Sequence, residues 1–580
     1  MQHLRARPDP TAVARPGQCG PAHGALPDRR VALLLVALLS ACAPQRDEVA
    51  KRPGSTPFPF PYVDPQLMGA TPAATAAFTG MPGGSAGAPR IAYPLDGAMH
   101  PLNIGSMTFQ WTRGDTSSRV FRIRVSGGAT PYDFYVPCLV GTQCLFTPPP
   151  AGWLTIAKAN PNGQLTATVA GTDGRGGLVY QSPPIVIRFT PEAVTGGLYY
   201  WSAPETQAAT AGTTYRLPFG ATTAIPFITP GTLTNPRPCG GCHSVSRNGA
   251  VISFAATDED QSASKATLAV APTHTPEQET IVPTAMNAPN ARFTALNSDG
   301  SLVATTVFGH LQIYATAYGT AVDIGAPESL LPTGKLLTHP EWSPNGRRIA
   351  FTLYSTSAPD GSGTRSIGDT RPEDGQIATL ELDPDTGKVT RLRVILVPSQ
   401  SDGMAHYYPS WSPDEHWLVV TAVPRGTSVY SATGARLRLV SADSEMQTCP
   451  GATCFDLANA SQGTDASSTW AKVTPFSQAN KTLIFVAFSS KADYGLVLAN
   501  KGPNGAQRAQ LWMSAIDLSK ATVGSDPSFP PIWLPFQNIT QTNHLPFWTT
   551  AVTCASAGTV ADACGDGQVC RNGICETAPR

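Results

Sequence analysis

Two cysteines and a histidine stand close together in the segment Pro238-Cys-Gly-Gly-Cys-His-Ser-Val-Ser-Arg-Asn-Gly249. The spacing Cys-x-x-Cys-His is the attachment signature of c-type haem. The thiols of Cys239 and Cys242 would form thioethers with the two haem vinyl groups, and the His243 imidazole would be the proximal iron ligand. The two glycines let the backbone approach the macrocycle closely. The segment therefore predicts one covalently bound haem c.

Two other chemistries fit the same residues. A disulfide between Cys239 and Cys242, of the thioredoxin type, would need a βαβ context, whereas the runs that follow this segment are β-rich. A zinc site would need a further Cys or His pair. We therefore expect haem ahead of a structural disulfide, and a disulfide ahead of a metal site.

The remaining cysteines form local groups, which is typical of proteins in an oxidising compartment. Short separations predict one disulfide in each of two loops, while the connectivity of the four cysteines near the C-terminus stays open. The expected disulfide cysteines are Cys138 with Cys144, Cys449 with Cys454, and Cys554, Cys564, Cys570 and Cys575 among themselves.

The N-terminal segment "RRVALLLVALLSAC" has two arginines followed by a short apolar run. The run is shorter than the roughly 20 residues that span a bilayer, and it fits the apolar part of a signal peptide. The end of this segment, Leu39-Ser40-Ala41-Cys42, resembles a bacterial lipobox. That resemblance implies a lipoprotein signal over residues 1–42, a lipid on Cys42 and, because Ala43 follows, an outer-membrane anchor facing the periplasm or the cell surface. A plain signal peptide and a short buried helix are the alternatives.

The composition favours a turn-rich β-protein. The 580 residues include 53 glycines and 55 prolines, and charged residues make 14%, against about 25% in ordinary domains. The 40 basic and 40 acidic side chains cancel, which argues against nucleic acid as a partner. We expect the chain to contact an envelope protein, which is either a redox partner or a binding partner. We also expect it to contact the membrane through its lipid.

Domain boundaries follow from changes in the pattern. Residues 43–88 are rich in Pro, Gly and Ala, which predicts a flexible tether. Residues 89–190 contain short β-runs such as "VFRIRV" and "PPIVIRF", which predict a β-sandwich. This stretch resembles immunoglobulin-like or fibronectin-like accessory domains. Residues 553–580 carry four cysteines and read as a disulfide-held tail.

A turn followed by a β-run recurs between these regions, as in "SVSRNGAVISFAA", "ALNSDGSLVATT", "EWSPNGRRIAFT" and "SWSPDEHWLVVTA". A small sheet with two apolar faces buries both only in a ring of such sheets. The segments "WSPNGRRIAF" and "WSPDEHWLVV" resemble the repeat of TolB-like, WD40-like propellers. The resemblance covers residues 196–552 and implies roughly six blades, so the expected fold class is all-β.

A haem in this setting would take its sixth ligand from another blade. His339, His406 and His544 each lie within three residues before a Pro-x-Trp unit, which predicts related positions near one face of the propeller. We prefer His544 as the distal ligand, because the last blade closes the ring beside the first. His406 is the alternative, and Met404 and His310 are further options.

These features lead to an envelope lipoprotein whose propeller carries one haem c, used for electron transfer or haem-linked redox sensing. The alternative is a propeller without enzymatic activity that binds a protein or glycan, with the two cysteines of the motif structural. A haem enzyme such as a peroxidase would need an open distal face and an acid–base residue, and neither is evident in the sequence.

Overall fold

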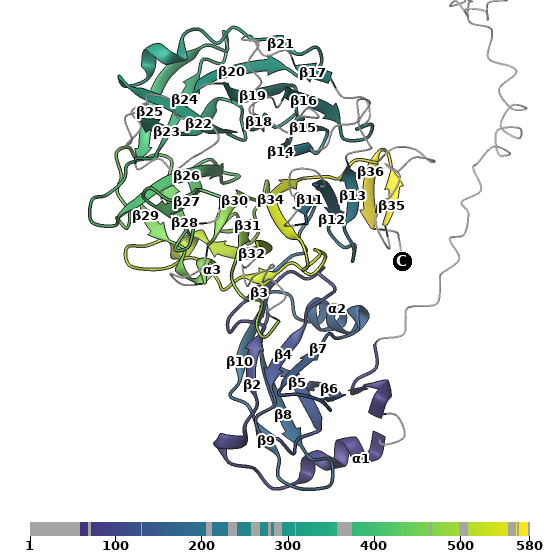
Figure 1. The fold of residues 1–580 in the computed structure, drawn as a ribbon. Coiled ribbons are helices and arrows are strands. Elements are labelled where there is room, and N and C mark those ends of the chain that lie inside the picture. The colour runs from purple at the N-terminus through teal and green to yellow at the C-terminus, as the bar shows by residue number, and fades with distance from the viewer. Residues whose placement is uncertain are drawn as a thin grey trace, which may run out of the picture. The chain divides into compact units, whose positions relative to one another are not determined.

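The computed structural model describes residues 58–67, 71–128, 130–204, 212–229, 240–256, 267–276, 280–282, 293–307, 309–355, 374–430, 432–462, 467–497, 508–554, 564 and 568–577. β-Strands dominate this part of the chain, as Figure 1 shows. Cys42 and Cys239 lie outside the described residues. None of the helices in the ranges above is long and apolar enough to cross a bilayer.

The N-terminal region contains two sheets around a common core. In β5 (Val120–Ser126) buried and partly exposed residues alternate, so Phe121, Ile123 and Val125 enter the core from one face of the sheet. The helix α2 (Pro150–Ala159) adds the fully buried Trp153. The larger sheet has the order β1 (Tyr62–Val63), β6 (Tyr132–Pro137), β5, β8 (Gln164–Thr172), β10 (Ile185–Phe189) and β3 (Met99–His100), with β9 (Tyr180–Gln181) beside β8; the smaller has β2 (Arg90–Tyr93), β4 (Phe109–Thr112) and β7 (Gln143–Phe146).

The prediction of a flexible tether up to residue 88 is wrong for the part that the structure describes. Strand β1 pairs in parallel with β6, with Tyr62 opposite Phe134. The Phe60 ring packs edge-on against Tyr132 and Phe134, with centroid distances of 5.1 and 5.4 Å. Phe78 packs against Tyr135. The short helix α1 (Thr71–Ala76) follows. The Pro, Gly and Ala content of the segment did not indicate these aromatic residues, which attach the segment to the first domain.

Six four-stranded antiparallel sheets make up the rest of the fold, and each is one propeller blade. From the inner to the outer strand, blade 1 is β34 (Thr542–Thr549), β11 (Gly197–Ala203), β12 (Thr213–Pro218) and β13 (Ile225–Ile228). Blades 2 and 3 are β14 (Gly240–Val245), β15 (Val251–Ala256), β16 (Thr267–Pro272), β17 (Thr280–Val282), and β18 (Thr294–Leu296), β19 (Leu302–Val307), β20 (His310–Ala315), β21 (Thr320–Ala321). Blades 4 and 5 are β22 (Lys335–Trp342), β23 (Arg348–Ser355), β24 (Gln376–Leu382), β25 (Val389–Leu396), and β26 (Met404–Trp411), β27 (Trp417–Pro424), β28 (Arg436–Ser441), β29 (Cys454–Asp456). Blade 6 is β30 (Thr469–Val473), β31 (Leu483–Ser490), β32 (Gln510–Asp517) and β33 (Ile532–Trp533).

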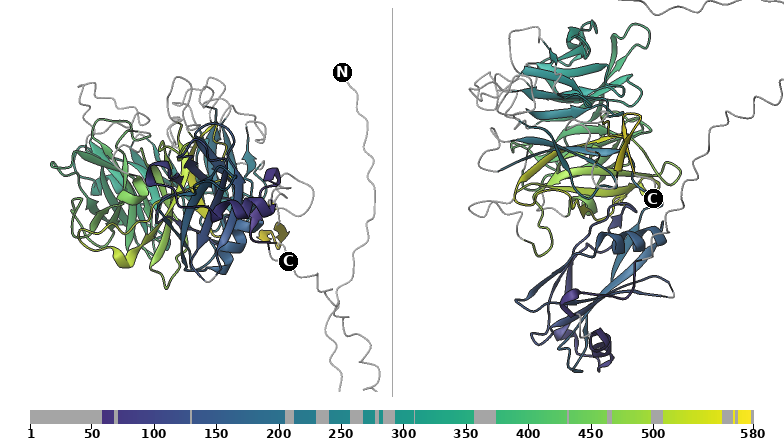
Figure 2. Two further views of the ribbon diagram at one scale, coloured as in Figure 1. Left: turned by 90° about the horizontal axis from the view of Figure 1, so that it is seen from below. Right: turned by 90° about the vertical axis from the view of Figure 1, so that its right-hand side faces the viewer.

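The ring closes through blade 1, which combines the first and last strands of the propeller. β34 pairs with β11, with Trp548 opposite Leu198. The yellow strand β34 lies beside the blue strand β11 in Figure 1, and Figure 2 shows the same neighbours from two further directions. The inner strands β14, β18, β22, β26, β30 and β34 contact one another in succession and back to β14. The expected number of six blades is therefore confirmed for the described residues.

The repeated turn has a common hydrogen-bond pattern. In blade 4 the Ser343 hydroxyl accepts from the Arg348 backbone N–H at 3.0 Å, and in blade 2 Ser246 accepts from Val251 at the same distance. A left-handed residue follows, which favours glycine because it has no Cβ. Gly346 has φ 73° in blade 4, whereas blade 5 places Glu415 there at φ 64°.

The C-terminal tail is held against the seam between blades 1 and 2. Its strands β35 (Gln568–Arg571) and β36 (Ile574–Thr577) form a hairpin. The backbone N–H of Cys575 donates to the Val552 carbonyl at 2.9 Å, and Arg216 of blade 1 donates to the Thr553 carbonyl at 3.1 Å. The tail is therefore bonded to blade 1, the blade that combines the first and last strands of the propeller.

Candidate functional site

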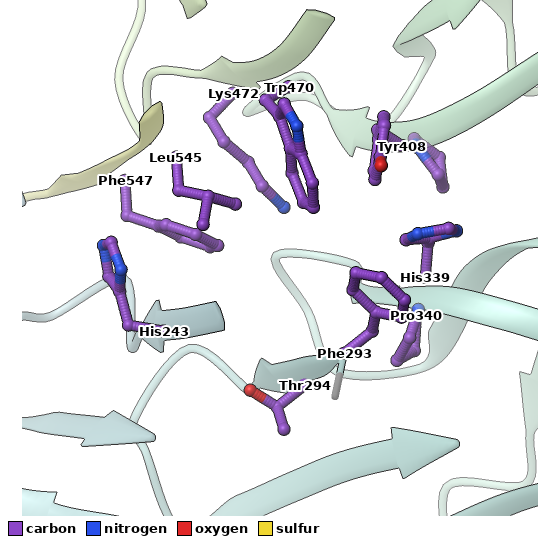
Figure 3. A pocket seen from close by; sticks show the side chains of 11 residues that line it. His243, Phe293, Thr294, His339, Pro340, Tyr408, Trp470, Lys472, Leu545 and Phe547 are labelled. Carbon is purple, nitrogen blue, oxygen red and sulfur yellow. The ribbon is translucent and has the colours of Figure 1, made fainter. Parts of the chain in front are cut away.

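All six inner strands border one small cavity on the propeller axis. The cavity has a volume of about 30 Å³, and Figure 3 shows the side chains around it. Five of its lining residues share a position, four residues before the Ser, Thr or Asn that begins the turn of their blade, and we call them the channel ring. The channel ring consists of Phe293, His339, Tyr408, Trp470 and Leu545.

A break in strand pairing turns the ring residues toward the axis. The register between inner and second strands shifts between Thr338 and Glu341 in blade 4, and equivalent shifts occur in blades 1, 2, 5 and 6. Four ring residues have left-handed backbones although they are bulky, which is a strained conformation. Their φ angles are 53° at His339, 51° at Tyr408, 57° at Trp470 and 56° at Leu545. Strain of this kind concentrates at functional sites.

Aromatic contacts hold the ring together on one side of the cavity. The His339 ring lies 3.9 Å from Phe293 and 4.3 Å from Tyr408, measured between centroids. Tyr408 and Trp470 stack at 3.9 Å. The histidine is therefore fixed in orientation by its neighbours.

A buried ion pair lies next to this aromatic group. Lys472 projects into the cavity in Figure 3, with its Nζ 2.5 Å from the Glu341 Oε2 and 4.5 Å from the centre of the Phe547 ring. Both charged side chains are largely buried. An ion pair and a cation–π contact together fix the ammonium group at this point.

His243 lines the opposite side of the same cavity, on β14 (Figure 3). It is 1% exposed, and neither ring nitrogen has a hydrogen bond of ordinary geometry among the described residues. Burial lowers the pKa of His243 to about 3, and a backbone interaction with Tyr199 opposes this only in part. The imidazole is therefore neutral at physiological pH, which is the form that coordinates a metal.

His339 is the second buried imidazole at the cavity. It is 4% exposed, and neither of its ring nitrogens has a hydrogen-bond partner in the part of the chain that the structure describes. Burial, and then the charge of Lys472, hold the pKa of His339 well below its ordinary value. An unpartnered buried imidazole is uncommon, because each such polar atom carries a desolvation cost.

The expectation that His339, His406 and His544 occupy related positions is wrong. His339 stands four residues before its turn residue Ser343, but His406 stands six residues before Ser412 and His544 five before Thr549. Side chains alternate between the two faces of a strand, and the register shift adds a further change. His339 alone of the three lines the cavity.

His406 and His544 have other neighbours. The His406 Nε2 accepts a hydrogen bond from the Arg438 Nη1 at 2.8 Å, and Arg438 also donates to Asp456 at 2.7 Å. His544 lies face to face with Trp201 at 6.5 Å, and burial lowers its pKa to about 4. Neither histidine lies where His243 faces the cavity, so the geometry does not favour them as distal ligands.

The structure describes only part of the Cys-x-x-Cys-His motif. Cys242 is in β14, but its side chain is not described, and Cys239 precedes the described residues. The disulfide predictions Cys138–Cys144 and Cys449–Cys454 agree with the structure. The structure also resolves the connectivity of the tail as Cys554–Cys570 and Cys564–Cys575. The close thiol groups of the tail are thus bonded to each other and do not form a metal site.

No protein-family model matches the chain, and no curated protein matches it. Solved structures that it resembles include TolB from Acinetobacter baumannii, at 10% identity, over 64% of this chain and 79% of that chain, with a TM-score of 0.33. They also include the putative TolB from Agrobacterium tumefaciens (13% identity, 61% and 99%, TM-score 0.31) and the hydrazine synthase of Kuenenia stuttgartiensis (10%, 47% and 62%, 0.26). At these TM-scores the matches carry no functional argument, and the propeller rests on the strand pairing described above.

Proposed function

We propose that this chain is an envelope lipoprotein whose propeller holds one covalent c-type haem through Cys239, Cys242 and His243. Its function would be electron transfer or haem-linked redox sensing, with an envelope protein as redox partner and a lipid on Cys42 as anchor. The observation that carries the proposal is the state of His243. Its imidazole is buried, its pKa is lowered by that burial, and neither ring nitrogen has a hydrogen bond of ordinary geometry among the described residues; it stands directly after the second cysteine of the motif.

The residue types fit the iron ligand, whereas the space beside the His243 imidazole in this arrangement does not fit a macrocycle. An imidazole without a hydrogen bond of ordinary geometry in the described part of the chain would be available for coordination, and the Phe547 ring lies 5.2 Å from it, measured between centroids. The cavity of about 30 Å³ is far smaller than a macrocycle, so it would not contain the haem. A bound c-type haem supplies a one-electron iron couple. The chain itself would supply two thiols, one axial nitrogen and an apolar surrounding, which favours the uncharged form of the ligand.

A second candidate is a binding propeller without haem. The observation in its favour is the small, donor-rich cavity in the channel, where His339 and Lys472 lie beside aromatic walls. In this case Cys239 and Cys242 would form a structural disulfide, and the channel would bind a partner or small ligand.

Covalent haem is tested by expressing the full chain together with a haem-maturation system. We expect haem stain to stay with the denatured chain on electrophoresis and to be lost in the double variant Cys239→Ala/Cys242→Ala. The matched control is Cys138→Ala/Cys144→Ala, which also removes two nearby cysteines and should keep the stain. His243→Ala should keep attached haem but change its absorption toward a high-spin spectrum. An unstained wild-type chain would reject the haem and leave the binding propeller.

A further inference from the structure

Exposed aliphatic side chains stand on a short loop of the first domain. The disulfide Cys138–Cys144 closes this loop, and its residues Leu139 and Val140 are exposed, Val140 to 85%. Leu145, in the following strand β7, is exposed as well. Large aliphatic side chains that gather at the surface of a protein mark contacts with another protein or with a membrane. The loop is therefore a candidate contact surface.

Two more exposed aliphatic side chains, Met81 and Leu178, stand on adjoining segments of the same domain. The Val179 backbone N–H donates to the Met81 carbonyl at 2.9 Å. Gly171 of β8 pairs with Tyr180 of β9, which begins two residues after Leu178. Met81 and Leu178 therefore lie where β8 ends.

Arg119 joins these segments to the disulfide loop. Its backbone N–H donates at 2.8 Å to the carbonyl of Thr172, the last residue of β8, and its carbonyl accepts from the Cys138 N–H at 2.9 Å. The exposed side chains thus gather at one end of the first domain, which we call the aliphatic end. The aliphatic end consists of Met81, Leu139, Val140 and Leu178.

Positive charge exceeds negative charge on the turns that carry these side chains. Arg113 donates to the Cys138 carbonyl at 2.7 Å, and Arg119 and Arg175 are exposed. The same turns carry two carboxylates, Asp115 and Asp173, and each accepts hydrogen bonds from backbone N–H groups of its own turn. The Arg119 guanidinium donates to carbonyl oxygens and to no carboxylate among the described residues. Three guanidinium groups therefore stand against two carboxylates.

Aliphatic side chains with guanidinium groups beside them match the surface of an anionic bilayer. The acyl chains accept the aliphatic groups, and the phosphate oxygens accept hydrogen bonds from arginine. Phe58, the first described residue, is the sixteenth residue after Cys42, and a chain of that length spans no more than about 58 Å. A lipid on Cys42 would hold the first domain within that distance of the bilayer, which favours a membrane over a diffusing protein as the occupant.

We propose that the aliphatic end inserts into the surface of an anionic lipid bilayer, with Leu139 and Val140 among the acyl chains and Arg119 at the phosphate groups. The inference rests on the proposed envelope location and does not depend on the haem. A single apolar contact of this kind binds a membrane reversibly. It would therefore orient a chain that the lipid on Cys42 already holds at the membrane, and it would not hold the chain there alone.

Vesicles of phosphatidylethanolamine with phosphatidylglycerol are the probe. The full exported chain carries Cys42→Ser, so that it has no lipid, and flotation at rising vesicle concentration measures its partition. We expect saturable binding that is lost on washing, and several-fold weaker binding to vesicles of phosphatidylcholine alone, which have no net charge. A chain that floats with neither kind of vesicle would overturn the proposal. Because this chain has no lipid and is made without haem maturation, its result is separate from the tests of the anchor and of the haem.

Paired variants locate the contact. Leu139→Ser/Val140→Ser should weaken the partition at least about tenfold, because the burial of two aliphatic side chains is lost. The matched control is Val523→Ser, since Val523 is 73% exposed on a loop of blade 6 and should leave the partition unchanged. Arg119→Gln should reduce the preference for phosphatidylglycerol several-fold, because it removes one charge near the phosphates. An unchanged partition of the folded double variant would refute the site.

Tryptophan fluorescence measures the insertion. In Val140→Trp the added emission should shift to shorter wavelength on vesicles and be quenched by brominated acyl chains, whereas Val523→Trp should show neither change. Equal quenching of the two variants would place the membrane contact elsewhere. Self-association of the wild-type chain without vesicle binding would put a second copy on the aliphatic end and reject the membrane as its occupant.

Discussion

Lys472 of blade 6 and Glu341 of blade 4 meet across the propeller channel, with 2.5 Å between Nζ and Oε2. The pair connects two blades that are not neighbours in the ring, so it contributes to the channel rather than to one blade interface. Arg247 of the blade 2 turn lines a cavity together with Glu341, and the charge of Glu341 partly offsets the lowering of the Arg247 pKa by burial. Glu341 therefore serves two buried cations.

This arrangement predicts unequal costs for removing the two partners. Glu341→Gln removes the carboxylate that pairs with Lys472 and whose charge also acts on Arg247, so it should lower the free energy of unfolding by about 3 kcal/mol, as for other broken buried pairs. Lys472→Met should lower the free energy of unfolding by clearly less, because the charge of Arg247 still acts on Glu341. Guanidinium unfolding of both variants measures the difference. Equal losses would show that Arg247 does not share the carboxylate.

Much of the propeller follows from local sequence, and the rest depends on long-range pairing. The Ser-x-Asn-Gly turns are local, because the Ser246 and Ser343 hydroxyls and the glycines act within a few residues. The pairing of Trp548 with Leu198 joins strands far apart in the chain. No local pattern specifies which strand completes blade 1.

The site was less predictable for the same reason. A register shift with a left-handed residue interrupts the alternation of side chains along the inner strand. All three histidines lie close to a Pro-x-Trp unit, so that proximity could not show that only His339 among them reaches the cavity. Counting back four residues from the turn residue would have found it. The two tail disulfides were equally hidden, because four cysteines allow three connectivities.

The tail should stabilise the closure of the ring. The disulfides Cys554–Cys570 and Cys564–Cys575 close loops of 16 and 11 residues, and loops of this length correspond to roughly 3 kcal/mol each by loop-closure entropy. Replacing all four cysteines by serine should lower the thermal midpoint and free the end of β34. Hydrogen exchange of β34 compared with β22 is the measurement. Faster exchange in both strands alike would mean that the tail does not act on the seam.

Buried histidines should make the protein sensitive to acid. Burial lowers the pKa of His100 to about 3, so the unfolded chain, with an ordinary value near 6.5, binds the proton first. The stability contributed by neutral His100 is present above about pH 6.5 and is lost as the pH falls toward 3. His100→Leu should therefore flatten the decrease in unfolding free energy over this range, by up to about 1.4 kcal/mol per pH unit. An unchanged pH profile would contradict a neutral buried His100.

The lipid anchor can be tested by location. Cys42→Ser should move the exported chain from the membrane fraction to the soluble envelope fraction, because the lipid would have no attachment point. High-salt washing separates a lipid anchor from charge-based adhesion. A variant that remains in the washed membranes would show that another part of the chain holds it there.

Mass spectrometry of the peptide spanning residues 217–247 tests the haem most directly. Trypsin releases this peptide after Arg216 and Arg247, and Cys239 and Cys242 are its two cysteines. For the full chain made with a haem-maturation system, we predict the mass of the peptide plus one haem. A peptide at its unmodified mass, or two hydrogens lighter as an internal disulfide, would contradict the haem and favour the binding propeller.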